Sequence, residues 1–172
     1  WPERAQSPDT NSTPVRVLLV DDHALVRAGI RTILGGIPGV EVVGEVSDGA
    51  EVEPLLPEAQ PDLVITDVSM KRLDGIALAG QLAKTHPEIR VLVLSVHTEA
   101  EYVMQALRCG VSGYVLKDGA MQELALAIRA VMRGESYLSP AVSGPVLDRV
   151  KRSEEHTSEL QSLRHLVCRL LL

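Results

Sequence analysis

Short apolar runs alternate along the chain with longer stretches in which apolar residues recur at helical spacing. Each short run is bounded by polar or turn-forming residues, which is typical of buried β-strands. The longer stretches repeat their apolar positions every three to four residues, which predicts amphipathic helices. The predicted strands are residues 15–20, 40–46, 63–66, 91–95 and 113–117. The predicted helices are residues 23–34, 49–57, 75–85, 99–109 and 120–133.

Residues that terminate helices follow most of these helical stretches. Gly35 and Gly36 come directly after the first, and Gly110 and Gly134 follow the fourth and the last. Glycine is common at this position because it adopts left-handed backbone angles without steric cost. We expect the second helix to stop at Pro57, because proline lacks the backbone donor that a helix interior needs.

Strands that alternate with helices predict an α/β fold, in which a five-stranded parallel sheet carries helices on both faces. The composition agrees with such a sheet. Aromatic residues make up only 2% of the chain and Phe is absent, so the core must be built from Val, Leu, Ile, Ala and Met. In open sheets of this kind the functional site lies outside the carboxyl ends of the strands, where the strand order reverses.

Polar residues with useful chemistry stand at four of these carboxyl ends. Asp21 and Asp22 follow the first strand, Asp67 follows the third, Ser95 ends the fourth and Lys117 ends the fifth. Each residue alone has an ordinary explanation, since an Asp after a strand commonly caps a helix and a Lys there is commonly solvated. Together, five such residues at one edge of the sheet indicate a site.

The residue types at this edge suit phosphoryl transfer. Mg²⁺ prefers oxygen ligands and often binds one or two carboxylates together with phosphate oxygens, which the acidic pair with Asp67 would provide. A carboxylate can also act as a nucleophile and form an aspartyl phosphate. Lys117 would add a positive point charge for the phosphoryl group, and Ser95 would add a hydrogen-bond donor.

Four segments resemble the receiver domains of two-component response regulators, and the resemblance covers about residues 15–134. These segments are VLLVDDH (17–23), DLVITDVSMKRLDG (62–75), VLVLSVHTEAEYV (91–103) and GVSGYVLKDG (110–119). Within that family the chain is most similar to the NarL/FixJ class, through SGYVLKD (112–118) and AIRAVMRGESYLSP (127–140). The resemblance implies a flavodoxin-like fold with strand order 2-1-3-4-5, Mg²⁺ as cofactor, and a cytoplasmic phosphorelay with a sensor histidine kinase as partner.

The resemblance assigns a role to each residue of the acidic group. Asp67 matches the phosphoacceptor of the family. Asp21 and Asp22 match the acidic pair that holds Mg²⁺, and the backbone carbonyl of Ser69 matches a further metal ligand.

Other positions match the residues that respond to phosphorylation. Ser95 matches the hydroxyl that follows the phosphoryl group, Tyr114 the aromatic switch that turns inward, and Lys117 the active-site lysine. Ser69 and His97 stand where family members vary and where the rate of dephosphorylation is tuned.

One residue departs from the family pattern. The family usually has proline four residues after the phosphoacceptor, and this chain has Lys71 there. Lysine does not fix the backbone angle φ as proline does, so we expect a looser loop with an added positive charge beside the phosphate site. Lys71 is therefore a third position expected to tune the lifetime of the phosphorylated state.

The resemblance also implies an output that this chain would control. In the NarL/FixJ class a helix-turn-helix domain follows the receiver, so the parent protein is expected to regulate transcription and to bind DNA through that domain. Homodimerisation on phosphorylation is expected, whereas catalysis beyond the domain's own phosphorylation and dephosphorylation is not. Two alternatives are a stand-alone receiver that acts by protein contacts, and a phosphatase of the haloacid dehalogenase type. The phosphatase would need a second Asp where Ser69 stands.

The segments around the predicted domain have a different character. Residues 1–14 are rich in Pro, Ser, Thr and Asn and are predicted to be a disordered leader. Residues 135–151 are predicted to be a linker, in which Ser139 and Pro140 could start a short helix. RSEEHTSELQS (152–162) and LVCRLLL (166–172) resemble a translated sequencing adapter, so residues 152–172 are expected to be non-native.

Net charge and hydropathy indicate which classes of partner the chain is not expected to bind. The net charge of −6 argues against nucleic-acid binding by these residues themselves. Apolar runs are all shorter than the roughly 18–20 residues that cross a bilayer, so no membrane partner is expected. Cys109 and Cys168 form neither a metal-binding nor a disulfide pattern, which suits a reducing compartment.

Overall fold

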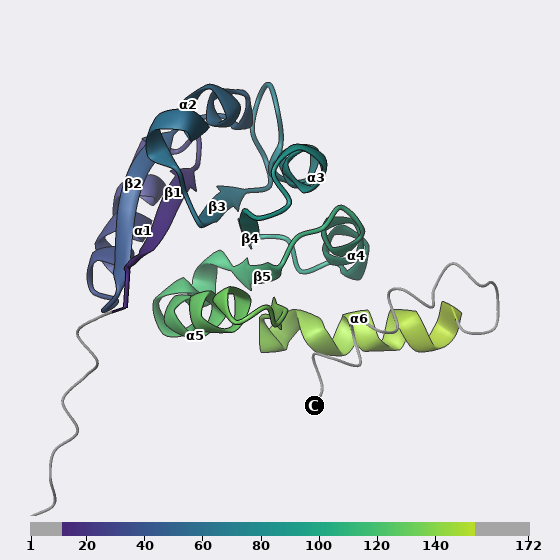
Figure 1. Cartoon of the computed structure of the whole chain (residues 1–172). Helices are drawn as coiled ribbons and strands as arrows, with labels where there is room; N and C mark the ends of the chain where they lie inside the picture. The colour runs from purple at the N-terminus through teal and green to yellow at the C-terminus, as the bar shows by residue number, and fades with distance from the viewer. Residues whose placement is uncertain (1–11, 154–172) are drawn as a thin grey trace, which may run out of the picture.

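A parallel β-sheet forms the centre of the computed structural model, which describes residues 12–153 (Figure 1). Its six strands are β1 (Val15–Val20), β2 (Val40–Val46), β3 (Leu63–Asp67), β4 (Arg90–Ser95), β5 (Gly113–Leu116) and β6 (Tyr137–Leu138). They lie in the order β2-β1-β3-β4-β5-β6, and every neighbouring pair is parallel. The predicted order 2-1-3-4-5 is therefore confirmed for the first five strands.

The prediction of five strands is wrong by one, because β6 extends the sheet beyond β5. Tyr137 and Leu138 pair with Gly113 and Tyr114. A strand of two residues is too short to give a recognisable alternation of apolar and polar positions, so its existence depends on tertiary contacts with β5.

Helices cover both faces of the sheet, as predicted. They are α1 (Ala24–Gly35), α2 (Val52–Ala59), α3 (Gly75–Thr85), α4 (Ala100–Arg108), α5 (Ala120–Met132) and α6 (Pro140–Ser153), with short 3₁₀ helices η1 (Gly49–Glu51) and η2 (Lys117–Gly119). Helices α1 and α5 pack on one face, and α2, α3, α4 and α6 pack on the other.

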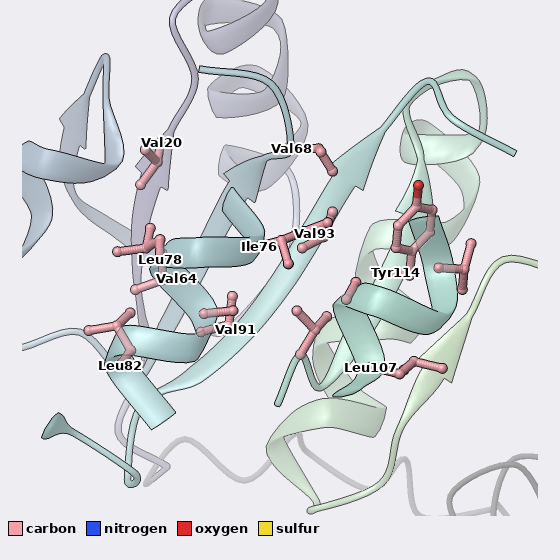
Figure 2. Close-up of a cluster of buried hydrophobic side chains, with 14 of the residues drawn as sticks. Val20, Val64, Val68, Ile76, Leu78, Leu82, Val91, Val93, Leu107 and Tyr114 are labelled. Atoms are coloured by element: carbon pink, nitrogen blue, oxygen red, sulfur yellow. The ribbon is translucent and has the colours of Figure 1, made fainter. Parts of the chain in front are cut away.

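The strands read as continuous apolar runs because both of their faces are buried. Alternate residues of β1 belong to different clusters, with Leu18 and Val20 on the face of α3 and α4, and Val17 and Leu19 on the face of α1 and α5. Figure 2 shows the first of these clusters, in which side chains of α3 lie over those of β1, β3 and β4. Packing on both faces holds the strands in place, so their carboxyl ends lie together at one edge of the sheet.

Most predicted element bounds lie within one residue of those in the structure, and two differences concern residues singled out in the sequence. Helix α2 does not stop at Pro57 but continues to Ala59, and Gln60 closes it with a left-handed backbone (φ 44°) while its N–H donates to the Leu56 carbonyl. Proline removes only one hydrogen bond this close to a helix end, so the helix tolerates it. Lys117, predicted to end the fifth strand, instead begins η2.

The segment predicted as a linker is folded onto the rest of the domain. Helix α6 begins at Pro140, as Ser139 and Pro140 suggest, but it is 14 residues long. Val142, Val146 and Val150 lie on one side of it and are buried in the same cluster as the apolar residues of α4.

The expectations for the two ends of the chain fall largely outside the described residues. Residues 1–11 of the predicted leader and residues 154–172 of the predicted non-native tail lie there. Among residues 12–153, no helix is long and apolar enough to cross a bilayer.

Candidate functional site

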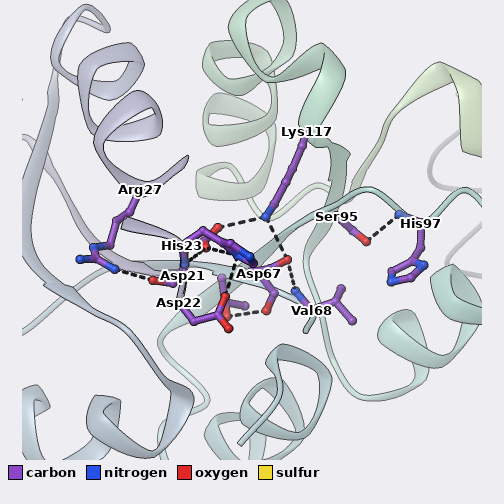
Figure 3. A network of polar contacts seen from close by, with 10 residues as sticks. Asp21, Asp22, His23, Arg27, Asp67, Val68, Ser95, His97 and Lys117 are labelled. Carbon is purple, nitrogen blue, oxygen red and sulfur yellow. Dashed lines mark hydrogen bonds and ion pairs between the residues drawn. The ribbon is translucent and has the colours of Figure 1, made fainter. Parts of the chain in front are cut away.

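Three charged side chains from different strand ends meet at the carboxyl edge of the sheet (Figure 3). Asp21 follows β1, Asp67 is the last residue of β3, and Lys117 follows β5. The Lys117 Nζ atom lies 3.0 Å from Asp21 Oδ2 and 3.2 Å from Asp67 Oδ1. Both carboxylates are buried, with 2% of Asp21 and 7% of Asp67 exposed. The structure thus brings together three residues that the sequence places far apart.

Burial and charge act in opposite directions on the ionisation of this group. Burial raises the pKa of Asp67, with a further contribution from the charge of Asp21, and this outweighs the opposing effect of Lys117. Burial alone would lower the pKa of Lys117, but its hydrogen bond to Asp21 and the charge of Asp67 outweigh burial and raise it. The lysine therefore stays protonated, and the Asp67 carboxylate is more basic than an exposed one.

The backbone around Asp67 holds its carboxylate in one orientation. The Val68 N–H donates to Asp67 Oδ1 over 2.8 Å, and the Gly75 N–H donates to the Val68 carbonyl over 2.9 Å. A Cβ atom on Gly75 would lie 2.1 Å from the Asp67 carbonyl oxygen. Only glycine allows the start of α3 to approach Asp67 this closely.

An acidic group suited to a metal ion lies beside this ion pair. One ligand atom from each of Asp21, Asp22, His23 and Asp67 can be chosen so that all four lie within 4.8 Å of one another. The Oδ1 atom of Asp22 is buried and accepts no hydrogen bond, although His23 Nδ1 lies 2.8 Å away in an ion-pair contact. A buried carboxylate oxygen that accepts no hydrogen bond is costly, so a cation bound beside Asp22 would be stabilising.

The donor set fits Mg²⁺ better than a softer metal. Three carboxylates are hard oxygen ligands, and Mg²⁺ commonly binds one or two of them while keeping several waters. His23 was not predicted as part of the site. The only signal for it in the sequence is its position directly after the acidic pair. In the structure the His23 N–H donates to Asp21 Oδ1 over 2.8 Å. Its ring is largely exposed.

Arg27 is a second residue that sequence reasoning missed. Its Nη1 atom donates to the backbone carbonyl of Asp21 over 2.6 Å, so the first turn of α1 holds the loop that carries the acidic pair (Figure 3). Helical periodicity gives no hint of this contact, because Arg27 occupies an ordinary polar position of the helix.

Ser95 and Tyr114 are connected through the backbone of His97. Ser95 is fully buried at the end of β4, and its Oγ atom accepts a hydrogen bond from the His97 N–H over 3.0 Å. Tyr114 is also fully buried and points inward, and its hydroxyl donates to the His97 carbonyl over 2.8 Å. The His97 ring stacks on Tyr102 of α4, with centroids 4.4 Å apart.

Ser69 and Lys71 lie in the loop between β3 and α3, and both are exposed. Within residues 12–153, neither side chain belongs to the acidic group, and Lys71 forms no ion pair. The backbone carbonyl of Ser69 is predicted to be a metal ligand, and both residues are predicted to tune the rate of dephosphorylation.

Comparisons with known proteins agree with this geometry. A family model described as "Response regulator receiver domain" matches residues 17–129. The chain is 32% identical over 154 residues to the transcriptional regulatory protein DegU of Brevibacillus brevis, and this match covers 87% of the chain and 65% of DegU. The chain thus spans slightly less than two thirds of the length of this relative.

Solved structures show the same fold. A two-component response regulator of the LuxR family from Aurantimonas sp. SI85-9A1 matches with a TM-score of 0.75 and 32% identity, over 79% of this chain and 97% of that one. The isolated receiver domain of RcsB from Salmonella enterica serovar Typhimurium, determined with the phosphomimetic BeF₃⁻, matches with a TM-score of 0.71 and 32% identity, over 77% and 99%. With both its sequence and its fold matched, the chain belongs to the response regulator receiver domain family.

Proposed function

We propose that this domain accepts a phosphoryl group on Asp67 from the phosphohistidine of a sensor histidine kinase. The observation that carries the proposal is the contact of Asp67 with Lys117 beside the Asp22 oxygen that accepts no hydrogen bond. The buried Asp67 carboxylate thus lies next to the cationic side chain of Lys117 and next to a position suited to Mg²⁺. Phosphoryl transfer needs positioning and charge neutralisation, and these residues provide both.

The contacts of Asp67 identify the reacting atom. Val68 and Lys117 both contact Oδ1, so we assign Oδ2 as the nucleophile. Oδ2 forms a bond to phosphorus while the bond from phosphorus to the kinase histidine nitrogen breaks, and the histidine leaves with the electron pair. Lys117 neutralises part of the charge on the transferred group. Mg²⁺, held by Asp21, Asp22, Asp67 and the Ser69 carbonyl, would supply further positive charge when bound.

The response to phosphorylation would pass through Ser95 and Tyr114. In our proposal the Ser95 hydroxyl turns to donate to a phosphoryl oxygen and gives up the hydrogen bond from His97. Tyr114 contacts the same backbone unit, so a shift of His97 would move the start of α4. The domain would then catalyse its own dephosphorylation at a rate tuned by Ser69, Lys71 and His97.

The output we propose is regulation of transcription by a DNA-binding domain of the parent protein. The support is that DegU is a transcriptional regulatory protein and that the solved relative belongs to the LuxR family. The proposal includes homodimerisation on phosphorylation and a cytoplasmic location. A stand-alone receiver is the alternative, and the gene sequence downstream of codon 151 distinguishes the two. The family match leaves an Asp-dependent phosphatase without support.

Phosphorylation by a small donor tests the central step. The chain is incubated with acetyl phosphate and Mg²⁺, and base-labile phosphate on the protein is measured for wild type, Asp67→Asn and Asp74→Asn. Asp74 is an exposed carboxylate that caps α3 near the site, so it is a matched control. We expect labelling of wild type and Asp74→Asn and none of Asp67→Asn. Full labelling of Asp67→Asn would show that another residue is the acceptor.

A further inference from the structure

Asp48 connects the end of β2 to the loop that follows Asp67. Its side chain is buried, with 5% exposed, and it accepts three backbone hydrogen bonds. The Ala50 N–H donates to Oδ1 over 2.9 Å, the Arg72 N–H to Oδ2 over 2.9 Å, and the Leu73 N–H to Oδ1 over 3.1 Å. Two of the three donors therefore belong to the loop between β3 and α3.

Gly49 reinforces this contact. A Cβ atom at position 49 would lie 2.5 Å from the backbone carbonyl oxygen of Leu73. The backbone of η1 therefore packs directly on the loop, and a side chain at Gly49 would push the two apart. Asp48 and Gly49 together fix the far end of the loop.

The near end of the loop is fixed at Val68, whose carbonyl accepts the Gly75 N–H. Residues 69–71 lie between these two attachments. The family's usual proline would restrict the backbone here, but Lys71 does not. The carboxylate of Asp48 restrains the two residues that follow Lys71 instead, by charge-assisted hydrogen bonds that are stronger than neutral ones.

We propose that Asp48 is a positioning residue that holds the loop after Asp67 so that the Ser69 carbonyl faces the acidic group. This inference rests on the proposed function, since it gives Asp48 a role in metal binding and phosphorylation. Asp48 does not touch the metal or the phosphoryl group. It acts through its backbone hydrogen bonds to Arg72 and Leu73, and the Arg72 Nε atom adds an ion-pair contact with Asp48 Oδ1 at 3.9 Å.

The ionisation of Asp48 agrees with this role. Hydrogen bonds from Ala50 and Arg72 outweigh burial and lower its pKa below the ordinary value of 3.8. A carboxylate with a lowered pKa stabilises the folded state fully when the pH is above its ordinary pKa. This stabilisation is lost as the pH falls through the lowered pKa. The restraint on the loop is therefore complete at neutral pH.

The test compares Asp48→Ala with Asp62→Ala in the full chain. Asp62 is a matched control, because its carboxylate also accepts a backbone N–H, from Arg16 over 2.9 Å, but at the opposite edge of the sheet. Three quantities are measured: amide hydrogen exchange at Arg72 and Leu73, the Mg²⁺ dissociation constant by calorimetry, and the rate of phosphorylation by acetyl phosphate. Asp48→Asn is included because its amide oxygen can still accept a hydrogen bond, which rescues a variant that otherwise folds poorly.

We expect Asp48→Ala to speed exchange at Arg72 and Leu73 and to weaken Mg²⁺ binding about 10-fold, as loss of an outer positioning contact typically does. Phosphorylation of Asp48→Ala should slow in parallel. The Mg²⁺ affinity of Asp48→Asn should lie between those of wild type and Asp48→Ala, and that of Asp62→Ala should match wild type. Unchanged Mg²⁺ affinity in both Asp48 variants would overturn the positioning role while leaving the phosphoacceptor intact. Absence of labelling in wild type would instead overturn the proposed function, and weaker Mg²⁺ binding by Asp48→Ala would still support the positioning role.

Discussion

The Nζ atom of Lys117 lies 3.2 Å from Oδ1 of Asp67, although β4 separates β3, which ends at Asp67, from β5, which ends just before Lys117. Lys117 begins η2 just beyond the end of β5, so its long side chain can pass the end of β4 and reach Asp67 and Asp21. This single cation compensates two buried carboxylates. Stability therefore depends on the same side chain that assists phosphoryl transfer in the proposed function.

Replacement of Lys117 by Met should reduce stability as well as phosphorylation. It leaves the carboxylates of Asp21 and Asp67 buried without a cation, and breaking a buried ion pair in this way costs about 3 kcal/mol. Lys84→Met, at an exposed position of α3, is the control. Urea unfolding measures the difference, and added Mg²⁺ should restore part of it. A loss no larger than that of Lys84→Met would contradict the compensation.

Replacement of Asp22 by Asn should weaken Mg²⁺ binding at least 10-fold, because a carboxylate ligand becomes a neutral amide. The Mg²⁺-induced rise in melting temperature should shrink correspondingly. Without Mg²⁺ the variant loses only the ion-pair contact of Asp22 Oδ1 with the largely exposed His23, so its stability should change by less than about 1 kcal/mol. Asp148→Asn, on the exposed side of α6, should retain the full response. An unchanged response in Asp22→Asn would remove Asp22 from the metal site.

Replacement of Lys71 by Pro should change the half-life of the phosphorylated domain at least twofold. Proline restricts the loop and also removes a positive charge, so Lys71→Ala separates the two effects. The decay of label is followed after removal of the phosphodonor. A change in Lys71→Pro alone would assign the effect to the backbone, and a change in both variants would assign it to charge. Equal half-lives in all three proteins would show that this position does not tune the rate.

Replacement of Val146 by Ala should lower the free energy of unfolding by about 1.5 kcal/mol, since two buried carbon groups are lost at roughly 0.8 kcal/mol each. Val146 is fully buried where α6 joins the apolar cluster that contains residues of α4. Arg152→Ala, at an exposed position of the same helix, should have no measurable effect. Equal stabilities of the two variants would mean that α6 does not pack as the structure shows.

The parts of the fold that the sequence predicts are those that depend on local patterns. Continuous apolar runs identify the first five strands, and the polar residues at their ends identify Asp21, Asp67 and Lys117. β6 could not be predicted, because two residues carry no pattern. The role proposed for Asp48 could not be predicted either, since the hydrogen bonds from Arg72 and Leu73 come from backbone N–H groups, which any sequence would offer. The Arg72 side chain adds only an ion-pair contact at 3.9 Å. Only the folded arrangement shows which backbone a carboxylate meets.

The site of the acyl phosphate can be located chemically. Borohydride reduces an aspartyl phosphate to homoserine, so reduction of the labelled chain followed by peptide mass spectrometry identifies the modified residue. The experiment is run with acetyl phosphate and Mg²⁺, and the peptide that contains residues 62–75 also holds Asp62 and Asp74 as internal controls. We predict homoserine at position 67 and unmodified aspartate at the other two positions. Homoserine at any other aspartate, with position 67 unmodified, would contradict the account.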